Sequence, residues 1–177
     1  MANERQFKLR TRFIATRGVQ EYRATIPHLV TSEDHVLELG CEWGSTTLIL
    51  AQYGGRVIGT DVSAACIERA RQRHPDIAFA VLDAFDVHAA LNLGATFTTI
   101  YMDLSGLSSY RALLDVVALM NMYATVFQPR VIVVKSGALK HFAHYCEAWD
   151  QRHKQQQVET FTTTAETHDA SITEVIS

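Results

Sequence analysis

The sequence predicts an α/β protein built on a doubly wound, mostly parallel sheet of seven strands, with helices on both faces. Apolar runs typical of buried strands alternate with helix-like segments along the chain. The first of these runs, at 36–39, leads into a turn with glycine at positions 40 and 44, and small hydroxyl residues then begin a helix. Glycines between a strand and a helix let the backbone approach a ligand closely, so this turn predicts a nucleotide site.

The remaining elements follow from the same periodicities. Strands are expected near 35–40, 56–61, 77–83, 98–103 and 130–135, and helices near 45–53, 63–74, 86–92, 109–126 and 139–155. In the long helix 109–126, a stripe of apolar side chains is expected to face the core: Tyr110, Leu113, Leu114, Val117, Met120 and Met122.

The two ends of the chain are expected to differ from this alternation. Residues 10–29 read as one or two amphipathic helices that Pro27 ends or kinks. Two final apolar runs, 158–165 and 171–176, leave little room for a helix between them. They are therefore expected to form an antiparallel hairpin at the edge of the sheet.

Four consecutive strand candidates end in an acidic residue. These are Glu38, Asp61, Asp83 and Asp103. Ligands of open parallel sheets bind beyond the carboxyl ends of the strands, so the four side chains are expected to face one crevice. Any one of them alone has a plainer interpretation as a solvated loop residue or a helix cap.

These residues carry a resemblance to a known family. In the segment Glu38–Gly44, in Asp61 and in Leu82-Asp83-Ala84, the chain resembles the class I S-adenosylmethionine-dependent methyltransferases, from about Val36 onward. The resemblance implies a loop around the methionine part of the cofactor, an aspartate on the ribose hydroxyls and another at the adenine amino group. The residues it assigns to cofactor binding are Glu38, Gly40, Cys41, Glu42, Gly44, Asp61, Val62, Asp83 and Ala84. Glu42 departs from the family, which has glycine there, and a side chain disfavours any positive φ that the loop needs.

The catalytic candidates are Asp103, Lys135 and Glu174. Asp103 and Lys135 end neighbouring strands, and a lysine at the end of a buried strand is costly without a partner. The pair could orient or deprotonate an acceptor. The three residues resemble the last three members of the Lys-Asp-Lys-Glu tetrad of ribose 2′-O-methyltransferases, but the first lysine is missing. A structural salt bridge for Lys135 and an ordinary edge-strand position for Glu174 remain open.

Composition limits the class of protein. The chain has 177 residues, of which 47% are hydrophobic and 20% charged, as expected for one globular domain with an N-terminal helical segment, 1–30, and a Rossmann-like domain, 31–177. It has neither an apolar run of the roughly 20 residues that span a membrane nor an apolar leader, so a cytoplasmic location is expected. Three cysteines and eight histidines show no metal-ligand spacing, so no metal site is expected.

Three functions remain open at this stage. The leading one is an S-adenosylmethionine-dependent methyltransferase that acts on a small molecule or a nucleic acid, including RNA ribose. The second is a non-catalytic S-adenosylmethionine-binding or regulatory protein on the same fold, and the third is a nicotinamide-dependent oxidoreductase. The net charge of −3 does not indicate a nucleic-acid binder. The first 23 residues nevertheless carry an excess of arginine and lysine, either as a solvated helix face or as an arm that engages an anionic substrate.

Overall fold

The computed structural model describes residues 10–94, 96–107 and 109–147. The chain divides into two compact units, Met1–His144 and Tyr145–Ser177, and the first contains the sheet. Its strands are β1 (Arg12–Thr16), β2 (His35–Leu39), β3 (Arg56–Asp61), β4 (Ala78–Val81), β5 (Thr99–Met102) and β6 (Val131–Lys135). Its helices are α1 (Val19–Ala24), α2 (Ile26–Leu29), α3 (Ser45–Ala51), α4 (Ala64–Arg73), α5 (Val87–Leu91), α6 (Leu113–Phe127) and α7 (Gly137–Tyr145), with 3₁₀ turns at Ser105–Leu107 and Tyr110–Ala112.

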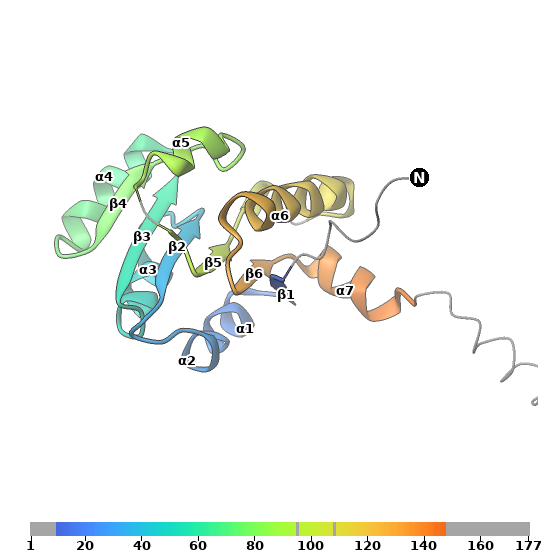
Figure 1. Ribbon diagram of the computed structural model, residues 1–177. Coiled ribbons are helices and arrows are strands. Elements are labelled where there is room, and N and C mark those ends of the chain that lie inside the picture. Colours follow the sequence, from blue (N-terminus) through green and yellow to red (C-terminus); the bar gives the residue numbers. More distant parts are fainter. Residues whose placement is uncertain (1–9, 95, 108, 148–177) are drawn as a thin grey trace, which may run out of the picture. The chain divides into compact units, whose positions relative to one another are not determined.

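The strands form one sheet in the order β1-β6-β5-β2-β3-β4, and every pairing is parallel. Alternate residues of β6 serve opposite cores: Ile132 and Val134 pack with α6, whereas Val131 and Val133 pack with α1 and α2. Figure 1 shows α6 and the blue helices α1 and α2 on opposite sides of the strands. The predicted doubly wound sheet with helices on both faces is therefore confirmed.

The number of strands differs from the prediction. The described part of the chain contains a sheet of six parallel strands rather than seven strands with one reversed. The expected hairpin of 158–165 and 171–176 lies outside the described residues, as does the part of the expected helix 139–155 beyond residue 147. Among the residues that can be described, no helix is both long and apolar enough to cross a membrane.

The expectation of helix throughout residues 10–29 was wrong. Arg12–Thr16 is a strand, β1, which pairs in parallel with β6 from Arg12 opposite Val131 to Thr16 opposite Lys135. β1 therefore occupies the sheet edge beside β6. The helices α1 and α2 follow it, with Pro27 in the first turn of α2, where a missing backbone N–H costs nothing. The division of the chain at residue 30 stays a prediction.

The predicted apolar stripe of α6 was wrong in part. Met120 is buried and Leu113 and Met122 pack against the core, but Leu114 is 81% exposed and Tyr110 and Val117 are exposed as well. The buried face consists instead of Val116, Leu119, Met120, Tyr123, Ala124 and Phe127. Both sets have helical spacing, and contact with the sheet decides between them.

The order of the strands defines where a ligand can bind. From β2 the chain proceeds outward to β3 and β4, and then returns to β5 on the other side of β2. The crevice between the carboxyl ends of β2 and β5 is therefore the topological switch point, the position at which open parallel sheets bind their ligands.

Candidate active site

The turn after β2 requires its two glycines. Gly40 has φ +81°, and a Cβ there would lie 2.1 Å from the carbonyl oxygen of Asp103. Gly44 has φ +80°, and a Cβ there would lie 2.7 Å from the ring of Phe79. Any side chain at either position would collide with a neighbouring element, so the turn can pass close to the end of β5 and to Phe79 of β4 only with glycine.

Glu42, at the position where the family has a third glycine, adopts the left-handed conformation with φ +50°. Its backbone N–H donates to Oδ2 of Asp61 at 3.0 Å, which holds the strained residue in place. The expected conflict between a side chain and a positive φ is therefore real, at a cost of about 1 kcal/mol. The side chain is exposed at the wall of a cavity, where it meets no steric obstacle.

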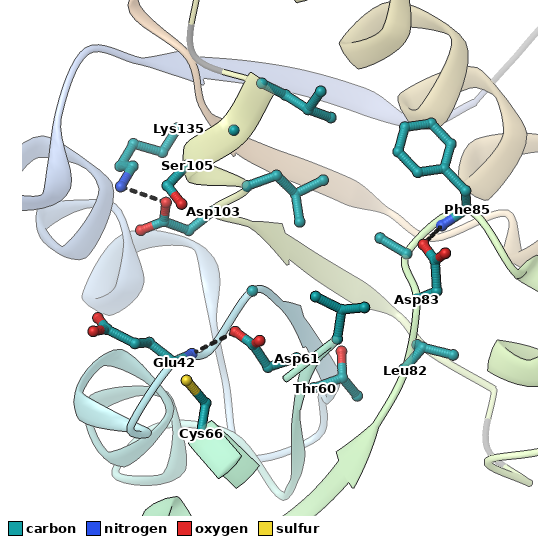
Figure 2. A pocket seen from close by; sticks show the side chains of 16 residues that line it. Glu42, Thr60, Asp61, Cys66, Leu82, Asp83, Phe85, Asp103, Ser105 and Lys135 are labelled. Carbon is teal, nitrogen blue, oxygen red and sulfur yellow. Dashed lines mark hydrogen bonds and ion pairs between the residues drawn. The ribbon is translucent and has the colours of Figure 1, made fainter. Parts of the chain in front are cut away.

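A cavity of about 470 Å³ lies at the switch point, beyond the carboxyl ends of the strands. Figure 2 shows Asp103, Lys135 and Ser105 at one end of this cavity, Asp61 in the middle and Asp83 with Phe85 at the other end. The predicted site residues that line it are Gly40, Glu42, Asp61, Val62, Asp83, Ala84, Asp103 and Lys135. Glu38, Cys41 and Gly44 are buried behind the wall, and Glu174 lies outside the described residues.

The carboxylates in the middle and at the far end are held by backbone N–H groups. Asp61 accepts from Glu42 through Oδ2 and from Ser63 at 2.9 Å through Oδ1. Asp83 accepts from Phe85 at 2.9 Å through Oδ1. A carboxylate offers about four acceptor positions, so both groups retain capacity for hydroxyl or amino donors of a ligand.

Asp103 and Lys135 form the predicted ion pair between the ends of β5 and β6. Their side chains are 17% and 22% exposed, so the pair is largely shielded yet reaches the cavity. Ser105 lies beside it, on the turn that follows β5 (Figure 2). An acid and a cation in contact with a cavity can orient a polar substrate and exchange a proton with it.

Glu38 is buried beneath the turn and 1% exposed. Burial raises its pKa to about 8, and the nearby negative charges of Asp103 and Asp61 act in the same direction. The hydroxyl of Thr47 donates to its Oε2 at 2.5 Å and, with the charge of Arg23, opposes this shift. Glu38 is therefore largely protonated at neutral pH in the free protein.

Several residues that line the site were not predicted from the sequence. Phe85, Leu104, Ser105, Leu107 and Cys66 also line the cavity. An exposed aromatic side chain two positions after Asp83 was a usable signal, since it places a ring beside the acid expected at an adenine. The others lie on turns whose path depends on tertiary contacts. Trp43, on the turn after β2, lies under the guanidinium groups of Arg69 and Arg73, at 4.2 and 4.9 Å from the ring centroid.

Comparison with known proteins identifies the family. The family model described as "Methyltransferase domain" matches residues 36–130, more than half of the chain, and the chain belongs to this family. The fold and the acids at the strand ends agree with the class I S-adenosylmethionine-dependent methyltransferases, whose cofactor is S-adenosylmethionine.

Individual relatives cover parts of the chain. Trans-aconitate 2-methyltransferase from Paracidovorax citrulli (strain AAC00-1) is 40% identical over 70 residues, which are 38% of this chain and 26% of that protein. The structure of DesVI from Streptomyces venezuelae is similar with a TM-score of 0.51 and 23% identity over 65% of this chain and 50% of that one. S-adenosylmethionine-bound CalS10 from Micromonospora echinaspora, an amino pentose methyltransferase, has a TM-score of 0.48 and 22% identity over 66% and 47%. The chain thus spans about a quarter of the curated relative and half of the DesVI chain.

The residues present fit this cofactor. Asp61 and Asp83 have acceptor capacity to spare, as a ribose and an adenine amino group require. Gly40 lines the cavity with its backbone alone, so a ligand can approach the main chain closely there. Four carboxylates and one lysine line the cavity, an excess of negative charge that suits a sulfonium cation.

Proposed function

We propose that this chain transfers a methyl group from S-adenosylmethionine to a small-molecule acceptor. The observation that carries the proposal is the Asp103–Lys135 ion pair, which lines the same cavity as Asp61 and Asp83. Acceptor chemistry and cofactor recognition would then share one crevice, as a direct transfer requires. The relative named as a trans-aconitate methyltransferase supports an acceptor of small size.

Each residue would have a separate part in this reaction. When bound, S-adenosylmethionine supplies an activated methyl group. Asp61 would accept from the ribose hydroxyls, Asp83 would accept from the adenine amino group, and the ring of Phe85 would cover the base.

Asp103 and Lys135 would act at the acceptor end. A hydroxyl or amine acceptor must lose a proton, which Asp103 can accept while Lys135 holds the acceptor atom. A carboxylate acceptor has no proton to lose, and Lys135 would then fix its position by charge and hydrogen bonds. Aligning the acceptor in this way would supply much of the rate enhancement.

Calorimetric titration with S-adenosylmethionine, S-adenosylhomocysteine and NAD tests the cofactor. Both adenosyl ligands are expected to bind, and Asp61→Ala should weaken them by about 1.5–3 kcal/mol through lost hydrogen bonds to a charged group. Asp76→Ala is the matched control, because Asp76 is an exposed acid that precedes β4 instead of following a strand. Binding of NAD alone would refute the methyltransferase proposal.

A labelled-methyl assay on metabolite, RNA and protein fractions of a cell extract tests the acceptor. Label is expected in the metabolite fraction and should fall at least a hundredfold with Lys135→Met. Label in nuclease-sensitive material would instead favour a nucleic-acid acceptor. Ligand binding without label in any fraction would favour the non-catalytic alternative.

A further inference from the structure

Arg23, near the end of α1, is a partly buried cation. The ion pairs within the described residues involve Arg130, Lys135 and Lys140, and none of them involves Arg23. Its Nε donates to the hydroxyl of Thr46 at 2.9 Å, and among the described groups its terminal nitrogens, Nη1 and Nη2, have no hydrogen-bond partner. These two nitrogens carry four N–H donors. A partly buried guanidinium usually has an anion beside it, so Arg23 has an open position for an anionic ligand.

The guanidinium of Arg23 lies beside the turn that follows β2. Thr46, which accepts its hydrogen bond, is in the first turn of α3, two residues after Gly44 and four after Glu42. Gly40 and Glu42 of the same turn line the ligand cavity. The terminal nitrogens of Arg23 are not among the fully buried unpaired atoms of the described side chains, so solvent or a ligand can reach them. The bond to Thr46 therefore fixes one edge of the guanidinium and leaves the other accessible.

The cavity offers no free cation for the amino-acid end of the cofactor. Among the described residues that line it, Lys135 is the one lysine or arginine, and it pairs with Asp103 at the acceptor end. The methionine part of S-adenosylmethionine, which carries a carboxylate, is expected at the turn after β2. The charged side chains that line the cavity near this turn are the acids Glu42 and Asp61, which would repel that carboxylate. A compensating cation must therefore come from an element beside the cavity wall.

Two other arginines flank the same turn from α4. The guanidinium groups of Arg69 and Arg73 lie on the ring of Trp43, at 4.2 and 4.9 Å from its centroid. Both side chains are exposed, whereas Arg23 is partly buried. An exposed guanidinium stays hydrated and needs no anionic partner, so Arg69 provides a matched control for Arg23.

We propose that Arg23 binds the carboxylate of the cofactor's methionine part through its terminal N–H groups, while Thr46 holds the guanidinium in place. The inference rests on the proposed function. A guanidinium presents parallel N–H groups that match the two oxygens of a carboxylate. The contact is the same for S-adenosylmethionine and S-adenosylhomocysteine, because both carry this carboxylate. Recognition of the adenosine part is left to Asp61 and Asp83.

Calorimetric titration with a ligand that lacks the amino-acid part tests this assignment. 5′-Methylthioadenosine keeps the adenosine and the sulfur but has no carboxylate, and it should bind the unaltered chain more weakly than S-adenosylhomocysteine. Arg23→Met in the full chain should weaken S-adenosylhomocysteine about 10- to 100-fold, as the loss of hydrogen bonds between charged groups predicts, and leave the affinity for 5′-methylthioadenosine unchanged. Arg23→Lys keeps the charge without the paired N–H groups and should recover part of the loss. Arg69→Met should change neither affinity.

A purely structural role of Arg23 predicts a different pattern. If Arg23→Met weakened both ligands equally, the proposal would be overturned, because only a distorted site also loses the ligand without a carboxylate. A selective loss of S-adenosylhomocysteine in Arg69→Met instead of Arg23→Met would overturn it too and assign the carboxylate to α4. Equal affinity of the unaltered chain for both ligands would overturn the role of Arg23 and leave the proposed function intact. Failure of the unaltered chain to bind either ligand or S-adenosylmethionine would overturn both.

Discussion

Asp34 and Glu38 lie at opposite ends of β2 and show how partners decide the state of a buried carboxyl group. Both side chains are almost completely buried. Burial alone would raise the pKa of Asp34, but the hydroxyl of Thr98, the backbone N–H of Thr31 and the guanidinium of Arg130 lower it to about 2. Glu38 has one hydroxyl donor and two acidic neighbours, and burial raises its pKa to about 8.

The contrast follows the direction of the strands. Asp34 precedes β2 and accepts hydrogen bonds from Thr98, Thr99 and Arg130. These bonds connect the N-terminal ends of β2, β5 and β6. Glu38 lies beside the carboxyl ends, where the ligand cavity opens. A buried carboxylate with a full set of hydrogen-bond donors stabilises the fold. A buried carboxyl group with few donors contributes less to stability, and its charge is more sensitive to nearby charges. The hydrogen-bonded carboxylate of Asp34 and the ligand cavity thus lie at opposite ends of the same strands.

The largest expected effect is on stability at the Asp34 end. Asp34→Ala removes hydrogen bonds to Thr31, Thr98 and Thr99 together with the ion pair to Arg130. The free energy of unfolding should fall by about 3 kcal/mol, measured by urea denaturation. Glu33→Ala is the control, since Glu33 is the exposed neighbour, and it should change stability by less than about 0.5 kcal/mol. A small effect of Asp34→Ala would remove the contrast between the two ends.

The pH dependence of stability should carry opposite signs for the two carboxyl groups. The folded chain holds the proton of Glu38 more tightly than the unfolded chain, so stability falls as pH rises from about 4.5 to about 8. The stability that Asp34 contributes is present above pH 3.8 and is lost as pH falls toward about 2. Glu38→Gln should flatten the upper range and leave the lower one unchanged in denaturation series. A fall above pH 4.5 that persists in Glu38→Gln would assign it to another group.

At the cavity end, the Lys135 ion pair should matter less for stability than the Asp34 network does. Lys135→Met leaves the partly buried carboxylate of Asp103 without its cation. The free energy of unfolding should fall by about 1 kcal/mol, because some solvent reaches the pair. Lys140→Met is the control, because the ion pair of Lys140 with Glu21 is more exposed and should contribute still less. A loss as large as that of Asp34→Ala would make the cavity pair a structural element.

The smallest expected effect on stability is that of glycine substitution at two strained residues, one near each end of the strands. Glu42 and Gln128 have φ +50° and +48°, and they are the non-glycine residues with positive φ in the described chain. Glycine at either position should raise the free energy of unfolding by no more than about 1 kcal/mol, because relief of strain is offset by entropy of the unfolded chain. Only Glu42→Gly should alter cofactor affinity in a binding titration. If Gln128→Gly changed cofactor affinity as much as Glu42→Gly, contact of Glu42 with the bound cofactor would be contradicted.

The sequence was sufficient for the parts of the fold that depend on local pattern. Acids at the ends of successive parallel strands must gather at one edge, so the meeting of Asp61, Asp83, Asp103 and Lys135 at one cavity followed from strand direction alone. A side chain at position 42 was expected to conflict with a positive φ, and Glu42 does adopt a positive φ, of +50°.

The predictions that were wrong concern elements whose structure depends on contacts with residues far away in the sequence. The apolar run of β1 is only three residues long, Phe13 to Ala15, and its strand conformation depends on pairing with β6. On α6, two apolar stripes have helical spacing, and only the neighbouring sheet selects the one that contains Leu119 and Tyr123. The burial of Tyr22 likewise results from the packing of α1 on the sheet, in a cluster with Tyr101 and Val133, which no local pattern in the sequence reveals.

The pairing of β1 with β6 has a consequence for biosynthesis. Thr16 and Val134, which are joined by a hydrogen bond, are 118 positions apart, so the first strand of the described sheet can pair only after its last strand has been synthesised. Contacts of such long sequence separation form late and slowly. Until then the residues of β1 have no neighbouring strand to pair with, and an unpaired strand is prone to associate with other chains.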